Sequence, residues 1–316
     1  MAESPDTRDT RDTRDTPELD PKPILEALGV GDVTSISPVR GGWDTAIWRV
    51  ERADGPAALR VFRPTQAASY AREVAAMAAA RAQGLPVPEV LAQGTWRERP
   101  VVLLEWCPGR TLAAALQERP WTAVRLGRAF GETQARIHAV PAPPELAAAP
   151  RAWMEWAGAE AVRLVPRLEA QAPSPPRLLH LDYHPLNVLT DGARITAVLD
   201  WTNTRAGDPR ADVARTHTIL RVQPLEPGPM RVPSRLVLWL VWLGWRRGYQ
   251  GAAGTLGEAE LAPYFAWAGH LMVRDLTPKI GRPGVWLREE DLESVRRWAA
   301  RWQEDVEKRA AAPTSL

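Results

Sequence analysis

Three side chains that lie close together along the sequence could bind a divalent cation: Asp182, Asn187 and Asp200. Two carboxylates and an amide offer hard oxygen ligands, which suit Mg²⁺ with bound phosphates better than a softer metal. Histidines at 180 and 184 flank the first carboxylate. These residue types and their spacing favour chemistry on a phosphate group that is held by Mg²⁺.

The segments around these residues predict a catalytic loop between short strands. Apolar residues 178–179 lead into the loop and residues 188–189 lead out of it. Residues 191–192 (Asp-Gly) predict a turn, and residues 195–199 form a second apolar strand that ends on a carboxylate. A hairpin of this kind would place the three oxygen-bearing side chains at one end of a small sheet.

The order of these residues also carries a resemblance to a known family. Residues 180–189 read H-L-D-Y-H-P-L-N-V-L, and residues 199–201 read L-D-W. H-x-D-x-x-x-x-N followed by an Asp after a hairpin resembles the catalytic and metal-binding segments of the protein-kinase-like fold. The closer match is to the aminoglycoside phosphotransferase family. The resemblance implies an α+β fold of two lobes, with a small antiparallel β-sheet in the N-terminal lobe and a mainly helical C-terminal lobe.

The resemblance further implies an activity and roles for the residues. The expected reaction is ATP- and Mg-dependent phosphorylation of a hydroxyl on a small molecule, such as an aminoglycoside-type antibiotic, an amino alcohol or a sugar, with GTP possible in place of ATP. Asp182 would orient the acceptor hydroxyl and receive its proton, and Asn187 and Asp200 would hold Mg²⁺. His184 would contact the transferred phosphate, whereas His180 would support the loop from beneath.

The N-terminal part offers candidates for binding the nucleotide phosphates. Strands are expected at 33–39, 47–50 and 58–62, and Gly41-Gly42 lies between the first two. In isolation these glycines indicate only a hairpin turn, but before such a meander they are candidates for a phosphate-covering loop. Arg60 would neutralise phosphate charge. Glu73, on an expected helix over 67–83, resembles the glutamate that pairs with this cation.

The resemblance places a hinge between the lobes at residues 105–109. Adenine would hydrogen-bond to the carbonyl of Glu105 and to the N–H of Cys107, since Pro108 has no N–H to donate. Cys107 has no visible base beside it, so it is interpreted as a packing residue and not as a nucleophile. The expected domain organisation is a disordered tail over 1–22, a nucleotide-binding lobe over 23–105, and a catalytic and acceptor-binding lobe over 106–316.

Several residues of the second lobe have both a structural and a functional interpretation. His138, at the end of a predicted helix over 126–138, is interpreted as a structural histidine. Asp212 either caps a helix or braces the catalytic loop, and Asp208 either shapes a turn or contacts substrate. Tryptophans 239, 242 and 245 recur every third residue, which predicts a helix that is buried on most sides. Some tryptophans of the C-terminal part could instead line an acceptor pocket: Trp239, Trp242, Trp267 and Trp286.

Composition excludes several classes of protein. The chain has 316 residues and a formal net charge of +2 without a basic stripe, so no nucleic-acid partner is expected. One cysteine excludes an internal disulfide and fits a reducing cytoplasm. The longest apolar run, residues 236–245, is about half the length of a membrane span. We expect a cytoplasmic protein, a monomer or homodimer, whose partner is a small-molecule hydroxyl acceptor.

Two alternatives stay open at the level of the sequence. His180, Asp182 and His184 form H-x-D-x-H, which could bind zinc for hydrolysis if the segment were a strand. This interpretation leaves the other polar candidates unexplained. The second alternative is a pseudokinase that binds nucleotide without turnover, although every acidic catalytic position is filled.

Overall fold

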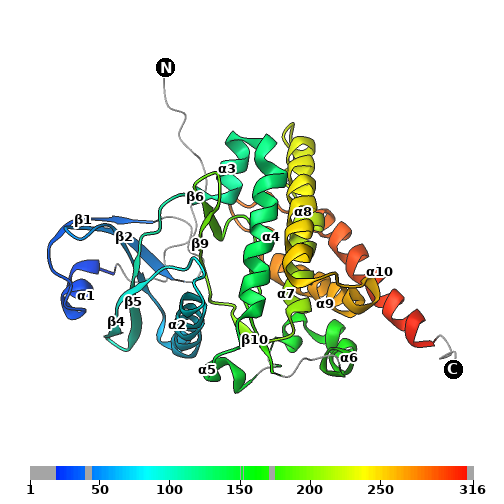
Figure 1. The fold of residues 1–316 in the computed structure, drawn as a ribbon, viewed down its shortest axis with the longest axis horizontal. Coiled ribbons are helices and arrows are strands. Elements are labelled where there is room, and N and C mark those ends of the chain that lie inside the picture. The colour runs from blue at the N-terminus through cyan, green and yellow to red at the C-terminus, as the bar shows by residue number, and fades with distance from the viewer. Residues whose placement is uncertain (1–18, 40–44, 150, 152, 171–174, 312–316) are drawn as a thin grey trace.

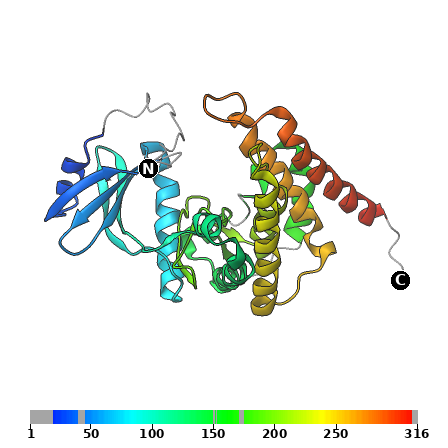
Figure 2. The ribbon, with the colours of Figure 1, turned by 90° about the horizontal axis from the view of Figure 1, so that it is seen from above.

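The computed structural model describes residues 19–39, 45–149, 151, 153–170 and 175–311. A β-rich lobe lies beside a larger helical lobe, and the short strands of the catalytic segment lie between them in both views (Figures 1 and 2). The expected two-lobed α+β fold is therefore confirmed. No helix among the residues described is long and apolar enough to cross a membrane.

The N-terminal lobe is a five-stranded antiparallel sheet with two helices. Its strand order is β1-β2-β3-β5-β4. The Asp20 side chain caps the first helix by accepting a hydrogen bond from the Lys22 N–H. The elements are α1 (Pro21–Ala27), β1 (Val33–Pro38), β2 (Ala46–Arg52), β3 (Ala57–Val61), α2 (Ala67–Ala82), β4 (Val90–Trp96) and β5 (Arg99–Glu105).

Strand β3 shows how alternation positions a functional side chain. Ala57, Leu59 and Val61 are buried on one face of the sheet, in a cluster with Ile24 of α1. Successive side chains of a strand point to opposite faces, so Arg60 emerges on the other face, where α2 packs.

The C-terminal lobe is built mainly from helices, with two small sheets that carry the catalytic segment. One sheet has the order β6-β8-β9 and the other pairs β10 with β7. The elements are β6 (Arg110–Thr111), α3 (Leu112–Glu118), α4 (Ala123–Ala139), α5 (Pro144–Ala147), two 3₁₀ helices (Met154–Ala157 and Ala159–Leu164), α6 (Val165–Ala170), β7 (Arg177–Leu179), β8 (Val188–Thr190), β9 (Ile195–Val198), β10 (Arg205–Gly207), α7 (Pro209–Val222), α8 (Arg231–Ala253), α9 (Glu258–Leu276) and α10 (Glu293–Ala311).

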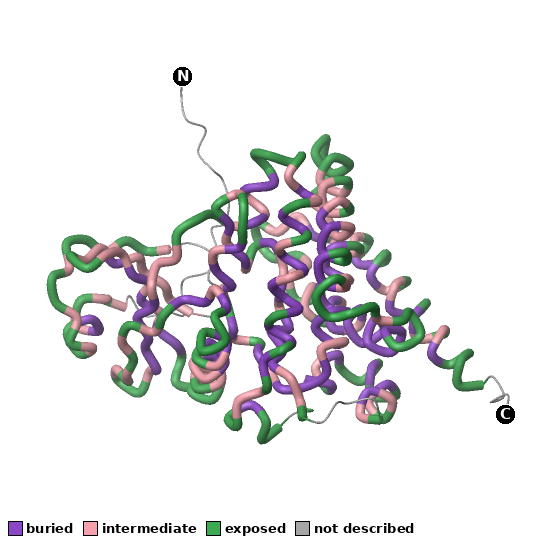
Figure 3. Tube along the Cα trace, in the orientation of Figure 1, coloured by how far each residue is buried: buried purple, intermediate pink, exposed green. Residues whose placement is uncertain are grey.

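Helices α4 and α8 run side by side and form the most closely packed helix pair of the lobe (Figures 1 and 3). Four glycines face the partner backbone directly, and a methyl group on any of them would overlap a carbonyl oxygen of the other helix. Small residues at a helix contact let the two backbones approach closely. These glycines are Gly127 and Gly131 on α4, and Gly244 and Gly248 on α8.

The tryptophan pattern on α8 predicted burial on most sides, which is wrong for the first half of the helix. Trp245 is 2% exposed, whereas Trp239 is 41% and Leu236 is 56% exposed. Each residue of an α-helix advances by about 100°, so side chains three positions apart do not point in the same direction. Trp239 and Trp245, six positions apart, therefore point about 120° away from each other. Trp267 on α9 is fully buried core.

Candidate functional site

The catalytic loop lies where the sequence predicts it, between β7 and β8. Strands β8 and β9 form the expected antiparallel hairpin, in which Val188 pairs with Val198. The Leu199 N–H donates to the carbonyl oxygen of Asn187 at 2.8 Å. This bond brings Asn187 and Asp200, two of the predicted metal ligands, to the same end of the hairpin.

Asp212 braces the loop from α7. Its carboxylate accepts hydrogen bonds from the backbone N–H groups of His180 (2.8 Å) and Leu181 (3.1 Å), and it contacts His138 Nε2 at 3.1 Å. Leu181 has a φ of 59°, a left-handed conformation that is unfavourable for a branched residue and that these bonds hold. Of the two predicted roles for Asp212, bracing is the observed one, while Asp208 caps α7.

His180 and His138 are both structural, as predicted. His180 is fully buried; its Nε2 lies 3.0 Å from the carbonyl oxygen of Leu199, and its Nδ1 accepts from the Asp182 N–H at 3.3 Å. Both ring nitrogens of His180 thus have hydrogen-bond partners, and residues 180–187 do not form a strand. Within the described part of the chain no group of three or more His, Cys, Asp and Glu side chains could hold a metal ion. The zinc-hydrolase alternative does not fit this geometry.

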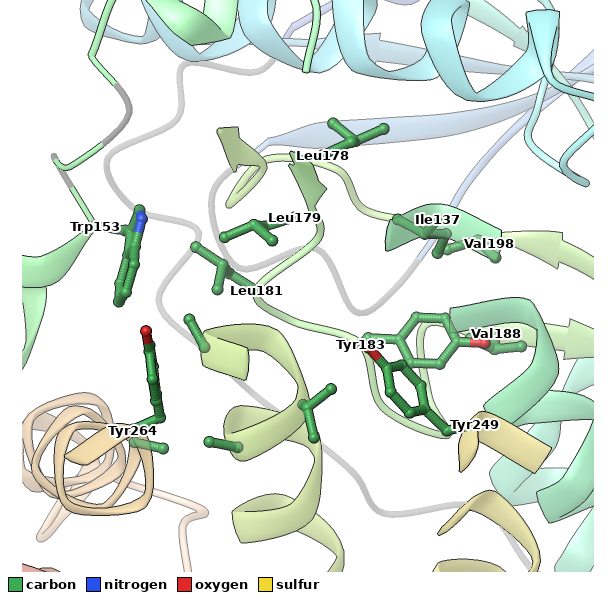
Figure 4. Close-up of a cluster of buried hydrophobic side chains, with 14 of the residues drawn as sticks. Ile137, Trp153, Leu178, Leu179, Leu181, Tyr183, Val188, Val198, Tyr249 and Tyr264 are labelled. Carbon is green, nitrogen blue, oxygen red and sulfur yellow. The ribbon is translucent and has the colours of Figure 1, made fainter. Parts of the chain in front are cut away.

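The loop packs onto the helical core through Tyr183, which follows Asp182. Its ring stacks on Phe130 with centroids 4.2 Å apart, and its hydroxyl donates to the Phe130 carbonyl at 2.8 Å. The Thr216 hydroxyl donates to the carbonyl of Tyr183 at 2.9 Å. Figure 4 shows the loop crossing a cluster of buried side chains. Core packing therefore fixes the backbone on both sides of Asp182.

Asp182 is held by the loop itself. The Asn187 amide Nδ2 donates to its carbonyl oxygen at 3.1 Å and to its Oδ2 at 3.2 Å, and His184 Nε2 lies 3.6 Å from its Oδ1. Burial raises the pKa of Asp182, but His184 and the charges of Arg215 and His180 outweigh it and hold the pKa well below its usual value. Asp182 is therefore ionised at neutral pH and can accept a hydrogen bond from a hydroxyl.

The predicted metal ligands fit a hard cation. Because the Asn187 amide nitrogen contacts Asp182, its oxygen remains for a metal. Asp200 is exposed, has a left-handed φ of 57°, and uses one oxygen, Oδ1, to accept from the Thr202 hydroxyl at 2.8 Å. Mg²⁺ at a nucleotide site usually takes only one or two ligands from the protein, and phosphates and water supply the others. The side-chain oxygens of Asn187 and Asp200 match this number.

The two lobes are joined by a chain of polar contacts. Arg60 and Glu73 form the expected ion pair, with side chains 11% and 2% exposed. Thr202, which the sequence did not single out, lies 3.2 Å from Glu73 Oε2 and contacts Asp200. Burial raises the pKa of Glu73, and the charge of Arg60 opposes this while that of Asp200 adds to it. The Arg60–Glu73 ion pair is thereby connected to Asp200, one of the predicted metal ligands.

In the hinge, the fold uses the backbone N–H of one residue and leaves that of the next without a partner among the described residues. The Trp106 N–H donates to the Pro56 carbonyl at 3.2 Å, which fixes the backbone where the chain leaves β5. Among the residues with described positions, none accepts a hydrogen bond from the Cys107 N–H. Burial, with a smaller contribution from Glu105, raises the pKa of the Cys107 thiol to about 11, so it is protonated at neutral pH and is a poor nucleophile.

Not every candidate is brought into the site. Gly41 and Gly42 lie outside the described residues, so their contact with phosphate stays a prediction. Trp267 donates from its indole to the Met154 carbonyl and is core, which removes it from the acceptor-pocket candidates. Trp242 packs edge-on against His217 at 5.6 Å between ring centroids.

Comparisons with known proteins agree with this geometry. The model of the phosphotransferase enzyme family matches residues 35–264. A thermostable mutant of aminoglycoside phosphotransferase APH(4)-Ia, solved with ADP and hygromycin B, is similar to the chain at 19% identity and a TM-score of 0.59, covering 93% of this chain and 99% of that one. An aminoglycoside-3'-phosphotransferase of type VIII is 19% identical with a TM-score of 0.54, covering 79% and 98%. The comparison with curated proteins gives no match.

The solved structures establish the fold, and the family match spans the catalytic loop, the ion pair and the metal-side hairpin. The chain belongs to the phosphotransferase enzyme family.

Proposed function

We propose that the protein transfers the γ-phosphoryl group of ATP, or of GTP, to a hydroxyl of a small molecule in a Mg²⁺-dependent reaction. The observation that carries the proposal is the continuous set of contacts from Arg60 through Glu73 and Thr202 to Asp200. These contacts would join the side of one lobe that we propose to bind the phosphates to the side of the other that we propose to bind the metal. Phosphoryl transfer needs this positioning and charge neutralisation more than covalent work by the protein.

Asp182 is proposed to orient the acceptor. Its carboxylate is ionised and held by Asn187, so it would accept a hydrogen bond from the hydroxyl and then its proton. A low pKa makes Asp182 a weak base, which is sufficient because the hydroxyl becomes strongly acidic only as the bond to phosphorus forms. His184, 3.6 Å away, is proposed to contact the transferred phosphate.

The remaining roles concern the nucleotide. Mg²⁺, when bound, would neutralise charge on the phosphates, and Asn187 and Asp200 would hold it. Arg60 would contact the α- and β-phosphates, oriented by Glu73. Adenine would meet the hinge at the carbonyl of Glu105 and the N–H of Cys107. Gly41-Gly42 would cover the phosphates.

The experiment that tests this function is thermal unfolding with and without Mg-ATP, followed by ADP release with hydroxyl acceptors. Ligand at 100 times its dissociation constant should stabilise the folded state by about 2.7 kcal/mol. Asp200→Ala should lose most of this shift. Asp182→Asn should keep it and lower turnover by about 10² to 10⁴.

Asp305→Asn is a matched control, because Asp305 lies on α10 and pairs with Arg309 of the same helix. It should behave as the wild type in both assays. Nucleotide binding without turnover of any acceptor would favour the pseudokinase alternative. Normal turnover by both Asp182→Asn and Asp200→Ala would show that these residues are not the site.

We further propose that the protein acts in the cytoplasm as a monomer or homodimer, with a nucleotide-binding lobe over 23–105 and an acceptor-binding lobe over 106–316. The free thiol of Cys107 is consistent with a reducing compartment. Gel filtration with light scattering would determine the oligomeric state.

A further inference from the structure

The first turns of α8 expose large apolar side chains. None of residues 231–240 is buried. The exposed fractions are 66%, 77%, 56% and 41% for Met230, Val232, Leu236 and Trp239. These four are half of the eight large apolar side chains that are exposed among the described residues. Side chains of this size and exposure present on the order of 400 Å² of apolar surface, and a contiguous patch of that size marks an interaction site.

The exposed side chains lie on one side of the helix. Each residue of an α-helix advances by about 100°, so Val232, Leu236 and Trp239 fall within about 60° of one another. We call these three residues the apolar face of α8. The upper turns of α8 have the exposed and intermediate colours in Figure 3. Arg235 holds these turns in place, because its guanidinium donates to two carbonyl oxygens, those of Arg221 (3.1 Å) and Gln223 (2.9 Å). The apolar face is therefore preformed.

The charged residues of α8 are all arginines. The chain has no Asp, Glu or Lys from residue 227 to residue 257. Arg246 and Arg247 are exposed, and Arg247 falls about 20° from Leu236 around the helix axis, so it continues the line of the apolar face. Arg246 lies 5.7 Å from the ring centroid of Trp242. The arginines of the helix are Arg231, Arg235, Arg246 and Arg247.

This combination of side chains favours one kind of partner over two others. A second copy, packed about a two-fold axis, would bring the same arginines together with no carboxylate of α8 to meet them. The apolar face also offers only half of the roughly 800 Å² per partner that a stable dimer needs. Nucleic acid would meet the arginines and leave the aliphatic side chains without a partner. An anionic bilayer surface accommodates both kinds of side chain, since apolar groups enter the acyl boundary and arginines stay at the phosphates.

We propose that the apolar face of α8 docks the protein reversibly on the surface of a bilayer that contains anionic phospholipid. This inference goes beyond the proposed function and does not depend on it. Residues 236–245, the longest apolar run of the chain, are too few to span a membrane but can lie along its surface. The tryptophan would sit at the level of the head groups, where such rings are enriched.

Vesicle flotation with the full chain tests the docking. One vesicle is phosphatidylcholine with about 30% phosphatidylglycerol, and the other is phosphatidylcholine alone. We expect the wild type to float with the anionic vesicles and to bind the neutral ones about tenfold more weakly or worse, since each arginine near an anionic surface contributes about a fivefold effect. High salt should release the protein, because it screens the arginines.

Substitutions on the apolar face separate docking from general stickiness. Leu236→Gln and Trp239→Gln keep a good helix former, so the urea unfolding midpoint should not change. Each should lower the vesicle partition coefficient by about 5- to 20-fold, the scale of one partly buried apolar side chain. Arg247→Gln should lower it by about fivefold.

Two variants are matched controls. Leu91→Gln removes apolar surface of similar exposure, 40%, from β4 in the other lobe. Arg297→Gln makes the same change of charge on α10, where the side chain is 74% exposed. Both should bind the anionic vesicles as the wild type does.

The other occupants of this face would give different results. Absence of wild-type binding to the anionic vesicles would overturn the proposal. Binding that is unchanged in Leu236→Gln and Trp239→Gln would show attachment through the arginines alone, as to any polyanion, and would also overturn it. Light scattering without vesicles adds a third result: a dimer that Leu236→Gln dissociates would show that a second copy covers the face and would refute docking on lipid. Phosphotransfer is not read in any of these assays, so they leave the proposed function untouched.

Discussion

His217 should make the fold sensitive to mild acid. It lies on α7 within an aromatic cluster, with the ring of Phe265 at 4.7 Å and the Trp242 indole donating to its Nδ1 at 3.4 Å. Burial lowers its pKa from 6.5 to about 3, and the charges of Arg221 and Arg246 act in the same direction. The imidazole is therefore neutral in the folded protein throughout the range in which cells operate.

The size of the effect follows from the difference between the two pKa values. As pH falls, the unfolded chain binds a proton near pH 6.5 while the folded protein does not, so the free energy of unfolding decreases between about pH 6.5 and 3. From pH 7 to pH 5 the expected loss is about 2 kcal/mol. Carboxylates with lowered pKa values, such as Asp212, contribute mainly below this interval.

Urea unfolding at pH 7, 6 and 5 would measure this loss. His217→Gln keeps an acceptor for the Trp242 indole and cannot gain a proton, so its stability should decrease by about 2 kcal/mol less than that of the wild type over the interval. His270→Gln is the control, since His270 contacts Gln303 on the α9–α10 side, and it should retain the wild-type slope. Equal slopes for the wild type and His217→Gln would refute the reasoning.

Three further predictions concern packing and the site. Gly131→Ala should destabilise the protein by about 1 to 3 kcal/mol in urea unfolding, because the methyl group overlaps the Trp245 carbonyl, whereas Gly251→Ala, which faces open space on α8, should cost nothing. Thr202→Val should raise KM for Mg-ATP by about 10-fold at unchanged unfolding midpoint, since it removes the hydroxyl that donates to Asp200 and lies beside Glu73. His184→Ala should lower kcat in steady-state assays, and an unchanged rate would eliminate it as a phosphate contact.

The parts of the site that the sequence could predict are local. The loop and hairpin around Asp182, Asn187 and Asp200 are contiguous, and short apolar segments with a turn residue specify them. The pairing of Arg60 with Glu73 was expected only from the resemblance, since the two residues are 13 positions apart and lie on different elements, β3 and α2.

What the sequence could not predict depends on how distant elements meet. Thr202 acquires its role only because α2 brings Glu73 from the other lobe. Arg215 is one of many arginines until the fold buries it and pairs it with Asp275 of α9. Strand β4 was not predicted, because Gly94 and the half-exposed Leu91 weaken its alternation.

The close contact of α4 with α8 bears on how this protein can evolve. Four glycine positions sit opposite backbone of the partner helix, so none can gain a side chain unless the helices separate. Phe130 and Gln134 on α4 support Tyr183 and the backbone of Asp212. Separating the helices would therefore disturb catalysis towards every acceptor at once. New specificities should arise by changes on α7, α9 and the 3₁₀ segments, while the α4–α8 pair stays constant.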